Sequence, residues 1–133
     1  MAIQPTSAAH TLEQNQDAIS SHQLISLLMA GGLERIGQAR TSLAEGKDED
    51  AEILVNKLIG IINGLRSSLN FEQGGEIALN LDNLYTYMLE RIDESDNKEK
   101  IEAVSEVGEL LTEVKVGWDD MDVKVPEVAE KAS

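Results

Sequence analysis

Apolar residues recur at intervals of three and four positions in four stretches of this chain, and polar or glycine-containing breaks separate the stretches. This spacing places the apolar side chains of each stretch on one face of an α-helix. It predicts helices at residues 21–44, 48–69, 76–95 and 99–119. None of the stretches shows the two-residue alternation of a half-buried β-strand. Because the breaks are short, consecutive helices should lie antiparallel, and we predict an all-α fold, an antiparallel up-and-down four-helix bundle.

Residue types at the ends of the first predicted helix support its boundaries. Ser20 or Ser21 precedes the helix, and a serine hydroxyl can accept a hydrogen bond from the free N–H groups of a first turn. Gly46 follows its end, where a glycine in the left-handed conformation commonly terminates a helix. The apolar face between these points is predicted to consist of Ile25, Leu28, Met29, Gly32, Ile36, Ala39 and Leu43.

The two ends of the chain differ in composition from the periodic middle. Residues 1–18 are polar and rich in small residues, so we predict a flexible N-terminal arm. Residues 120–133 are acidic and contain Pro126, and we predict a disordered acidic C-terminal tail. The helical bundle then forms a single domain at residues 19–119, which suits a chain of 133 residues.

The chain carries 25 acidic and 11 basic residues, a formal net charge of −14. A surface of this sign repels phosphate backbones and anionic lipids, so we expect neither nucleic acid binding nor membrane insertion. Two interpretations of the acidity stay open: it keeps the protein soluble, or it favours a basic partner. The chain has no cysteine, no segment resembling a signal peptide and no apolar run of about 20 residues, and we expect a soluble cytoplasmic protein.

Reactive side chains are scarce and form no recognisable catalytic or metal-binding pattern. The two histidines, His10 and His22, lie in the arm and at a helix start, outside the Glu-x-x-His and His-Glu-x-x-His patterns of metal-binding helices. We expect His22 to be a surface residue. The acidic side of the last helix is expected to be a solvated face and not a metal site; it comprises Glu102, Glu106, Glu109 and Glu113. We therefore expect no enzyme, no metal and no cofactor.

The apolar surface of the second predicted helix is wider than a bundle interior requires. Its apolar residues span an arc of about 160°, whereas a helix that only backs onto a core usually needs a stripe nearer 100°. The spare surface indicates a protein that binds an amphipathic segment of another chain. Gly60 and Gly64 lie inside the same helix, where each costs about 1 kcal/mol relative to alanine, and we expect close approach of another backbone to offset this cost.

We place the candidate binding groove between the second and third predicted helices, with part of the fourth. Its candidate residues are Val55, Leu58, Ile59, Ile62 and Leu65 from the second helix, facing Leu81, Tyr85 and Met88 from the third. The ring of Tyr85 would be buried while its hydroxyl bonds to a backbone group of the partner. For each residue the alternative is an ordinary place in the core, because a bundle fills its interior before it offers a groove. Periodicity does not name the partner, and a generic helical adaptor or an anti-sigma-like protein fits the same pattern.

Several sequence runs, in order and at family spacing, resemble the FliS family of flagellar export chaperones, which are flagellin-specific secretion chaperones. The runs are SHQLISLL (residues 21–28), LERIGQAR (33–40), IINGLRSSL (61–69), GGEIALNL with LYTYM (74–81 and 84–88), and EVGELL (106–111) with Trp118. The resemblance extends from Ile19 to Trp118. It departs from the family pattern at Ser21, where proline is usual, at residues 29–32, where the family commonly has Tyr-Asp-Gly-Ala, and in the arm, which lacks tyrosine.

The resemblance implies a bundle of antiparallel helices that binds the C-terminal segment of flagellin in apolar surface grooves. It implies that the protein prevents premature polymerisation of flagellin and delivers it to the export gate protein FlhA of the flagellar type III secretion system. The groove residues named above would then be the flagellin-binding residues. In the family the arm can cover part of the groove and contribute to docking at the gate, but an arm without tyrosine gives no basis for assigning that role here.

Overall fold

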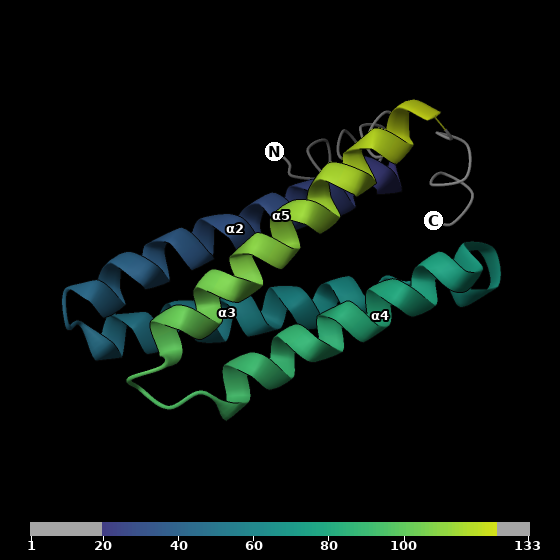
Figure 1. Ribbon diagram of the computed structural model, residues 1–133. Helices are drawn as coiled ribbons and strands as arrows, with labels where there is room; N and C mark the ends of the chain where they lie inside the picture. The colour runs from purple at the N-terminus through teal and green to yellow at the C-terminus, as the bar shows by residue number, and fades with distance from the viewer. Residues whose placement is uncertain (1–19, 125–133) are drawn as a thin grey trace, which may run out of the picture.

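The computed structural model describes residues 20–124, and this part of the chain contains four α-helices joined by short connections. The helices are α2 (Ser21–Ala44), α3 (Asp48–Ser67), α4 (Phe71–Glu94) and α5 (Lys100–Lys124). They run alternately up and down, so that each lies antiparallel to the next (Figure 1). The predicted all-α, antiparallel four-helix bundle is confirmed. The predicted arm and residues 125–133 of the predicted tail lie outside the described residues.

Hydrogen bonds and backbone geometry define α2 where the sequence predicted it. The Ser20 hydroxyl accepts a hydrogen bond from the backbone N–H of Gln23 at 3.1 Å, and the Gln23 side chain accepts one from the Ser20 N–H at 3.3 Å. This reciprocal pair is a capping box, which satisfies two N–H groups at the helix start. Gly46 has a φ of +76° just beyond the last turn, a left-handed conformation that glycine adopts without steric cost. Both predicted ends of α2 are confirmed.

α4 begins at Phe71, before the predicted start at residue 76. Asn70 caps the helix, because its side chain accepts a hydrogen bond from the N–H of Gln73 at 3.0 Å. Gly75 then interrupts the helix with φ 51° and ψ −124°, a combination that glycine tolerates and other residues avoid. The predicted start therefore marks a kink inside α4. α5 runs past its predicted end at residue 119 to Lys124, close to Pro126, which disfavours helix in the residue before it.

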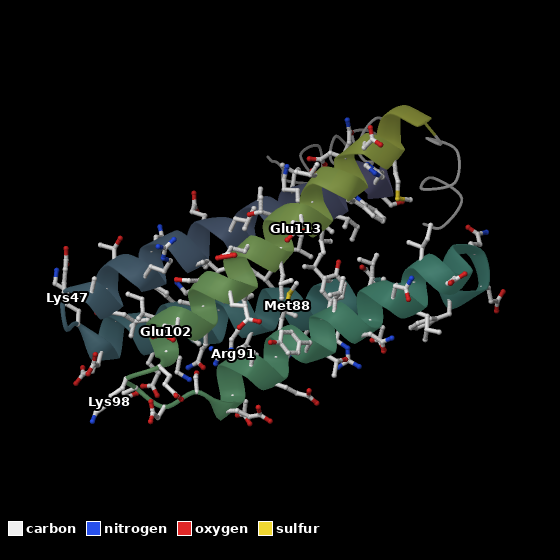
Figure 2. The ribbon with its side chains drawn as sticks, viewed as in Figure 1. Lys47, Met88, Arg91, Lys98, Glu102 and Glu113 are labelled. Atoms are coloured by element: carbon white, nitrogen blue, oxygen red, sulfur yellow. The ribbon has the colours of Figure 1, made fainter. Side chains whose placement is uncertain are left out.

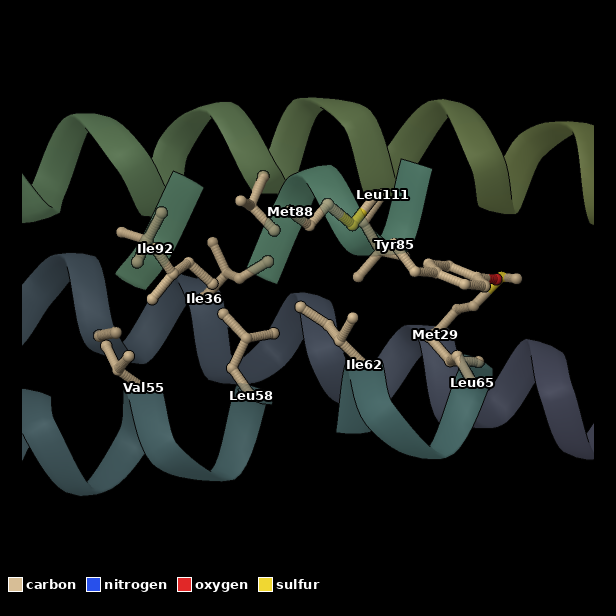
Figure 3. Close-up of a cluster of buried hydrophobic side chains, with 13 residues drawn as sticks. Met29, Ile36, Val55, Leu58, Ile62, Leu65, Tyr85, Met88, Ile92 and Leu111 are labelled. Carbon is tan, nitrogen blue, oxygen red and sulfur yellow. The ribbon is translucent and has the colours of Figure 1, made fainter. Parts of the chain in front are cut away.

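All four helices contribute to one hydrophobic core (Figure 3). Its enclosed cluster consists of Met29, Ile36 and Ala39 from α2, Val55, Leu58, Ile62 and Leu65 from α3, Tyr85, Met88 and Ile92 from α4, and Val104, Val107 and Leu111 from α5. One aromatic ring, that of Tyr85, lies among aliphatic and methionine side chains. Full burial of a large apolar side chain contributes about 1.5–3 kcal/mol, so this cluster is the main source of stability.

Two glycines allow α2 to lie close to its neighbours. A Cβ atom at Gly32 would lie 3.0 Å from Leu111 Cδ2 of α5 and 3.4 Å from Ile61 Cγ2 of α3. A Cβ atom at Gly108 of α5 would lie 3.1 Å from Ile36 Cγ2. The interior is already close-packed, so side chains at these two positions would push the helices apart. α2 consequently packs tightly against both α3 and α5.

α4 packs less extensively against α3 and α5 than α2 does. Polar side chains hold α4 at both of its edges. Arg66 of α3 donates from Nε to Asp82 of α4 at 2.9 Å. Arg91 of α4 donates from Nε to Glu106 of α5 at 2.7 Å. Glu106 thus links two helices, whereas the sequence placed it on a wholly solvated face.

The close approach expected at the glycines of α3 does not occur inside the described bundle. No atom lies within 4 Å of a Cβ built at Gly60. At Gly64 the nearest atom is Leu28 Cδ2, at an ordinary contact distance of 3.7 Å. The expectation is wrong for Gly60, which faces open space, and the helix carries the cost of that glycine without a packing gain from its own bundle.

The different surroundings of two helical glycines predict opposite effects of the same substitution. We expect Gly60→Ala to raise the free energy of unfolding by about 1 kcal/mol, because alanine loses less backbone entropy in a helix. We expect Gly32→Ala to lower it by about 1–3 kcal/mol, because the new methyl group meets Leu111. Urea denaturation followed by circular dichroism measures both changes. A shift in the same direction for both variants would contradict the packing described for α2.

Candidate peptide-binding surface

Most of the residues predicted to line a groove lie in the interior of the bundle. Six of the eight are at most 7% exposed: Val55, Leu58, Ile62, Leu65, Tyr85 and Met88. In this arrangement they pack against neighbouring helices and offer little surface to a partner. These six residues therefore occupy ordinary core positions, which was the alternative considered for each of them.

The hydroxyl group of Tyr85 is the polar exception in this interior. The residue is 1% exposed, and the hydroxyl forms no hydrogen bond within the described part of the chain. Burial raises the pKa of Tyr85 to about 12, so the hydroxyl stays protonated at neutral pH and remains a potential donor. A buried polar group without a partner costs roughly 1–3 kcal/mol. The predicted burial of the ring is confirmed, and the bond from its hydroxyl to a partner stays a prediction.

The other two predicted groove residues, Ile59 and Leu81, are partly buried and pack against the edge of the core. They do not lie side by side. Arg66 of α3 bonds to Asp82, the chain neighbour of Leu81, which places Leu81 level with Arg66. Ile59 lies two helical turns before Arg66, about 10 Å along the axis of α3. A partner that contacts both side chains must therefore extend along the bundle.

A cleft of about 360 Å³ opens between the first half of α3 and the last turns of α4. Its apolar lining consists of Leu43, Ala51, Val55, Ile59 and Ile92. Val55 and Ile59 belong to the predicted groove, so sequence analysis found part of the α3 side of this cleft. It missed the α4 side, because the groove was placed along the middle of α4 and not at its last turns.

Polar side chains surround this cleft at one end of the bundle. The same end carries the α2–α3 and α4–α5 connections, marked by Lys47 and Lys98 in Figure 2. The polar lining consists of Asp48, Glu49, Glu52, Asn56, Asp93, Asn97 and Lys100. Four of these groups are carboxylates and one is an ammonium group. The cleft thus combines an apolar floor with a mainly negative rim.

A second, more open depression of about 640 Å³ lies between α2 and α5. Its lining consists of Leu33, Ile36, Gly37 and Arg40 from α2 and Ser105, Gly108, Glu109, Thr112 and Glu113 from α5. The space exists partly because Gly37 and Gly108 carry no side chains. Sequence analysis did not identify this surface, since it depends on the separation of two helices that are far apart in the chain.

At the opposite end of the bundle, His22 of α2 stacks against Trp118 of α5 and is hydrogen-bonded to it. The two rings are stacked, with centroids 4.5 Å apart and planes 4° from parallel. Trp118 Nε1 donates to the His22 carbonyl oxygen at 2.9 Å, and His22 Nε2 is hydrogen-bonded to the Trp118 carbonyl oxygen. His22 is 2% exposed, so its predicted surface position is wrong. The indole ring that covers it comes from the far end of the chain, which helical periodicity does not indicate.

Asp119 adds polar contacts to the same junction between α2 and α5. The Ser26 hydroxyl donates to one oxygen of Asp119 at 2.6 Å, and Lys115 Nζ donates to the other at 2.7 Å. The hydrogen bonds from Lys115 and Ser26 hold the pKa of Asp119 below its usual range. The start of α2 and the end of α5 are therefore joined by ring stacking and by a charged network.

Glu106 of α5 joins α5 to α4 through hydrogen bonds. It accepts a hydrogen bond from the Tyr87 hydroxyl at 2.5 Å and another from Arg91 Nε at 2.7 Å. These two bonds lower the pKa of Glu106, and the bond to Glu106 raises the pKa of Tyr87. The carboxylate is thus stabilised in its charged form at the point where α4 meets α5.

The acidic side chains of the bundle are not gathered into a metal centre. Within residues 20–124, no three or more His, Cys, Asp or Glu side chains are arranged so that they could hold a metal ion. Over the same range, none of the helices combines the length and apolar character needed to cross a bilayer.

Comparison with known proteins identifies relatives of the chain. A family model described as Flagellar protein FliS matches residues 4–125, a range that includes all four helices. The flagellar secretion chaperone FliSB of Pseudomonas aeruginosa is 46% identical over 109 residues, which cover 82% of this chain and 86% of the relative. The resemblance identified from the sequence runs is confirmed.

Two further relatives support the same match. The flagellar secretion chaperone FliS of Vibrio cholerae serotype O1 is 33% identical over 111 residues, covering 84% of this chain and 82% of the relative. The flagellar secretion chaperone FliS of Salmonella typhimurium is 37% identical over 106 residues, covering 79% of this chain and 78% of the relative. The similarity therefore extends over the whole bundle and is not confined to one motif.

The hydrogen bonds at Glu106 predict a contribution to stability that depends on pH. Its pKa is lower in the folded chain than the ordinary value of 4.5, so the contribution is present above that value and is lost as the pH falls through the lowered pKa. We expect Glu106→Gln to unfold at a lower urea concentration than the wild type at neutral pH, with the difference shrinking as the pH falls below 4.5. Glu102→Gln, at an exposed position of the same helix, serves as the control. A difference for Glu106→Gln that stays constant with pH would contradict this account.

The unpaired hydroxyl of Tyr85 predicts an unusual response to its removal. We expect Tyr85→Phe to leave the free energy of unfolding unchanged or to raise it by about 1 kcal/mol, because a buried group without a hydrogen bond is lost while the ring remains. Urea denaturation at neutral pH measures the change. A loss of about 1 kcal/mol or more would mean that the hydroxyl is hydrogen-bonded in the free protein.

Proposed function

The chain belongs to the FliS family of flagellar secretion chaperones, and from this premise we propose that it binds the C-terminal segment of flagellin. Binding keeps the flagellin subunit from polymerising in the cytosol, and the loaded complex is passed to the export gate protein FlhA. The comparisons support the general role, that of a flagellar secretion chaperone. The identity of the segment and the delivery step are proposals.

The observation that carries the proposal is the partly exposed apolar surface along α3 and α4. Ile59 and Leu81 lie at the edge of the core and retain area that an incoming apolar side chain can cover. Removing apolar surface from water contributes about 25 cal/mol per Å², so several such contacts provide useful affinity. The distance between the two residues suits an extended or helical segment that follows the bundle.

Tyr85 supports a hydrogen-bonding role at the same surface. Its hydroxyl lies beside Met29 and Leu65 in the core (Figure 3) and has no partner within the described residues. A shift of the surrounding side chains on binding would let it donate to a backbone carbonyl of the segment. The five other buried residues of the predicted groove, Val55, Leu58, Ile62, Leu65 and Met88, then act by holding α3 and α4 in position.

Family membership favours this export role over the generic adaptor or anti-sigma-like alternative. A chaperone acts by covering a segment and not by changing a covalent bond, so we propose no catalytic activity. The two roles predict different partners in the same experiment. An adaptor of another pathway would not require the C-terminal segment of flagellin.

Binding to flagellin is tested by calorimetry with purified, monomeric flagellin and with flagellin that lacks its C-terminal segment. We expect binding to the first and none to the second. Addition of the FlhA cytoplasmic domain tests delivery, with tighter binding of the loaded complex than of either protein alone as the expected result. Equal affinity for both forms of flagellin would overturn the proposed segment.

Substitutions at the surface test where the segment lies. We expect Ile59→Asp and Leu81→Asp each to weaken binding about tenfold or more, because a carboxylate cannot be buried against an apolar side chain without a large cost. Ile53→Asp and Leu79→Asp are matched controls, because these residues are 55% and 53% exposed and lie outside the core-facing edges of α3 and α4. Circular dichroism checks that every variant is folded. If the controls weaken binding as much as Ile59→Asp and Leu81→Asp, the segment lies elsewhere.

A further inference from the structure

The cleft between α3 and α4 has features that specify the chemistry of what enters it. Val55 and Ile92 are buried in its floor, and Ile59 is partly exposed beside them. Glu52 of α3 and Asp93 of α4 are exposed at its rim. Its volume, about 360 Å³, falls at the lower end of the range of small-ligand sites, so it has room for one large apolar side chain and a part of its neighbours.

The carboxylates of the rim are not neutralised by the protein itself. None of Asp48, Glu49, Glu52 and Asp93 forms an ion pair or hydrogen bond with another described side chain. Lys100 is the one cation of the lining, and its Nζ donates to the carbonyl oxygens of Ile92 and Ser95 at 2.7 and 2.9 Å. The ammonium group thus caps the end of α4 instead of pairing with the rim.

The helix dipoles stabilise only some of the four carboxylates at the rim. Asp48 and Glu49 lie in the first turn of α3, where the helix dipole favours negative groups. Asp93 lies in the last turn of α4, where the same effect disfavours a negative group. Asp93 is therefore an unpaired carboxylate at the edge of an apolar cleft, in a position where the dipole of α4 disfavours negative charge. A positive group from outside would relieve this unfavourable interaction.

We propose that this cleft binds an apolar anchor residue of the flagellin segment that has a lysine or arginine beside it. The apolar side chain covers Ile59 above the floor, and the cation lies between Glu52 and Asp93. The inference rests on the proposed function and deepens it, because it states which part of the segment the cleft selects. It also favours the second of the two interpretations of the acidic composition, a surface suited to a basic partner.

Neutralising the rim tests the cation while leaving the floor intact. The double variant Glu52→Gln, Asp93→Asn is compared with Glu90→Gln, Glu102→Gln, which removes the same charge from exposed positions that do not line the cleft; Glu102 is marked in Figure 2. Calorimetry with purified flagellin is carried out in about 0.05 M and 0.5 M sodium chloride, which screen charges to different extents. At low salt we expect the cleft variant to bind about tenfold more weakly and the control less than threefold more weakly. Equal losses in the two variants would overturn the proposal while flagellin binding itself stands.

A second measurement keeps the cleft testable if flagellin does not bind at all. The probe is a synthetic amphipathic lysine–leucine peptide, with a glutamate–leucine peptide of the same length as its control. Amide chemical shifts of the full-length protein report the contact. We expect the lysine peptide to shift amides in the first half of α3 and the last turns of α4, and the effect to be lost in Glu52→Gln, Asp93→Asn. Shifts spread evenly over the acidic surface, or unchanged in that variant, would overturn the proposal.

Discussion

The close approach of α2 to α3 and α5 determines the shape of the rest of the bundle. At Gly32 and Gly108 the helices come so near that a single methyl group would meet a side chain at 3.0 or 3.1 Å. The three helices α2, α3 and α5 are therefore held by dense apolar packing around α2. α4 closes the remaining side of the bundle and relies more on Arg66, Arg91 and Glu106 at its edges. α4 thus has less contact with its neighbours than α2 has.

This difference in packing accounts for the partly covered residues at the edge between α3 and α4. The helix faces that meet at Gly32 and Gly108 cover each other, whereas Ile59 and Leu81 at the edge of the core are only partly covered. The cleft beside Ile92 arises in the same way, at the end of α4 that is farthest from its kink at Gly75. Leu27 of α2 and Val116 of α5 are exposed apolar residues outside this pattern, at 64% and 66%. A segment that lies along α3 and α4 would complete the packing that the bundle itself leaves unfinished.

Helical periodicity was sufficient to predict which face of each helix is buried, because burial in a bundle follows the 3.6-residue period closely. It was not sufficient to separate core from groove. Leu58 and Ile59 are neighbours on the same apolar arc, yet one is enclosed and the other partly exposed. Leu58 packs near Gly32 of α2, whereas Ile59 lines the cleft beside α4, and this depends on how the helices are arranged in space. The burial of His22 was missed for a related reason, since it depends on Trp118 at the far end of the chain. The start of α4 at Phe71 could have been predicted from Asn70, a residue type that often caps helices and here accepts from the N–H of Gln73. It was missed because Gly74 and Gly75 follow, and two glycines indicate a break between helices.

The proposed transfer of the bound segment requires that the chaperone release it, and weak contacts along α3 and α4 would suit that requirement. Each partly buried side chain retains only a fraction of its area, so each contact contributes less than the 1.5–3 kcal/mol or so of full burial. The carboxylates at the cleft lie in solvent, where a single ion pair contributes roughly 0–1 kcal/mol and is weakened by salt. In the proposed complex, binding affinity would be the sum of many weak contacts spread along the segment. Such a segment can be detached step by step, because no single contact has to be broken at a large cost, and a competing partner needs to displace only one part of it at a time.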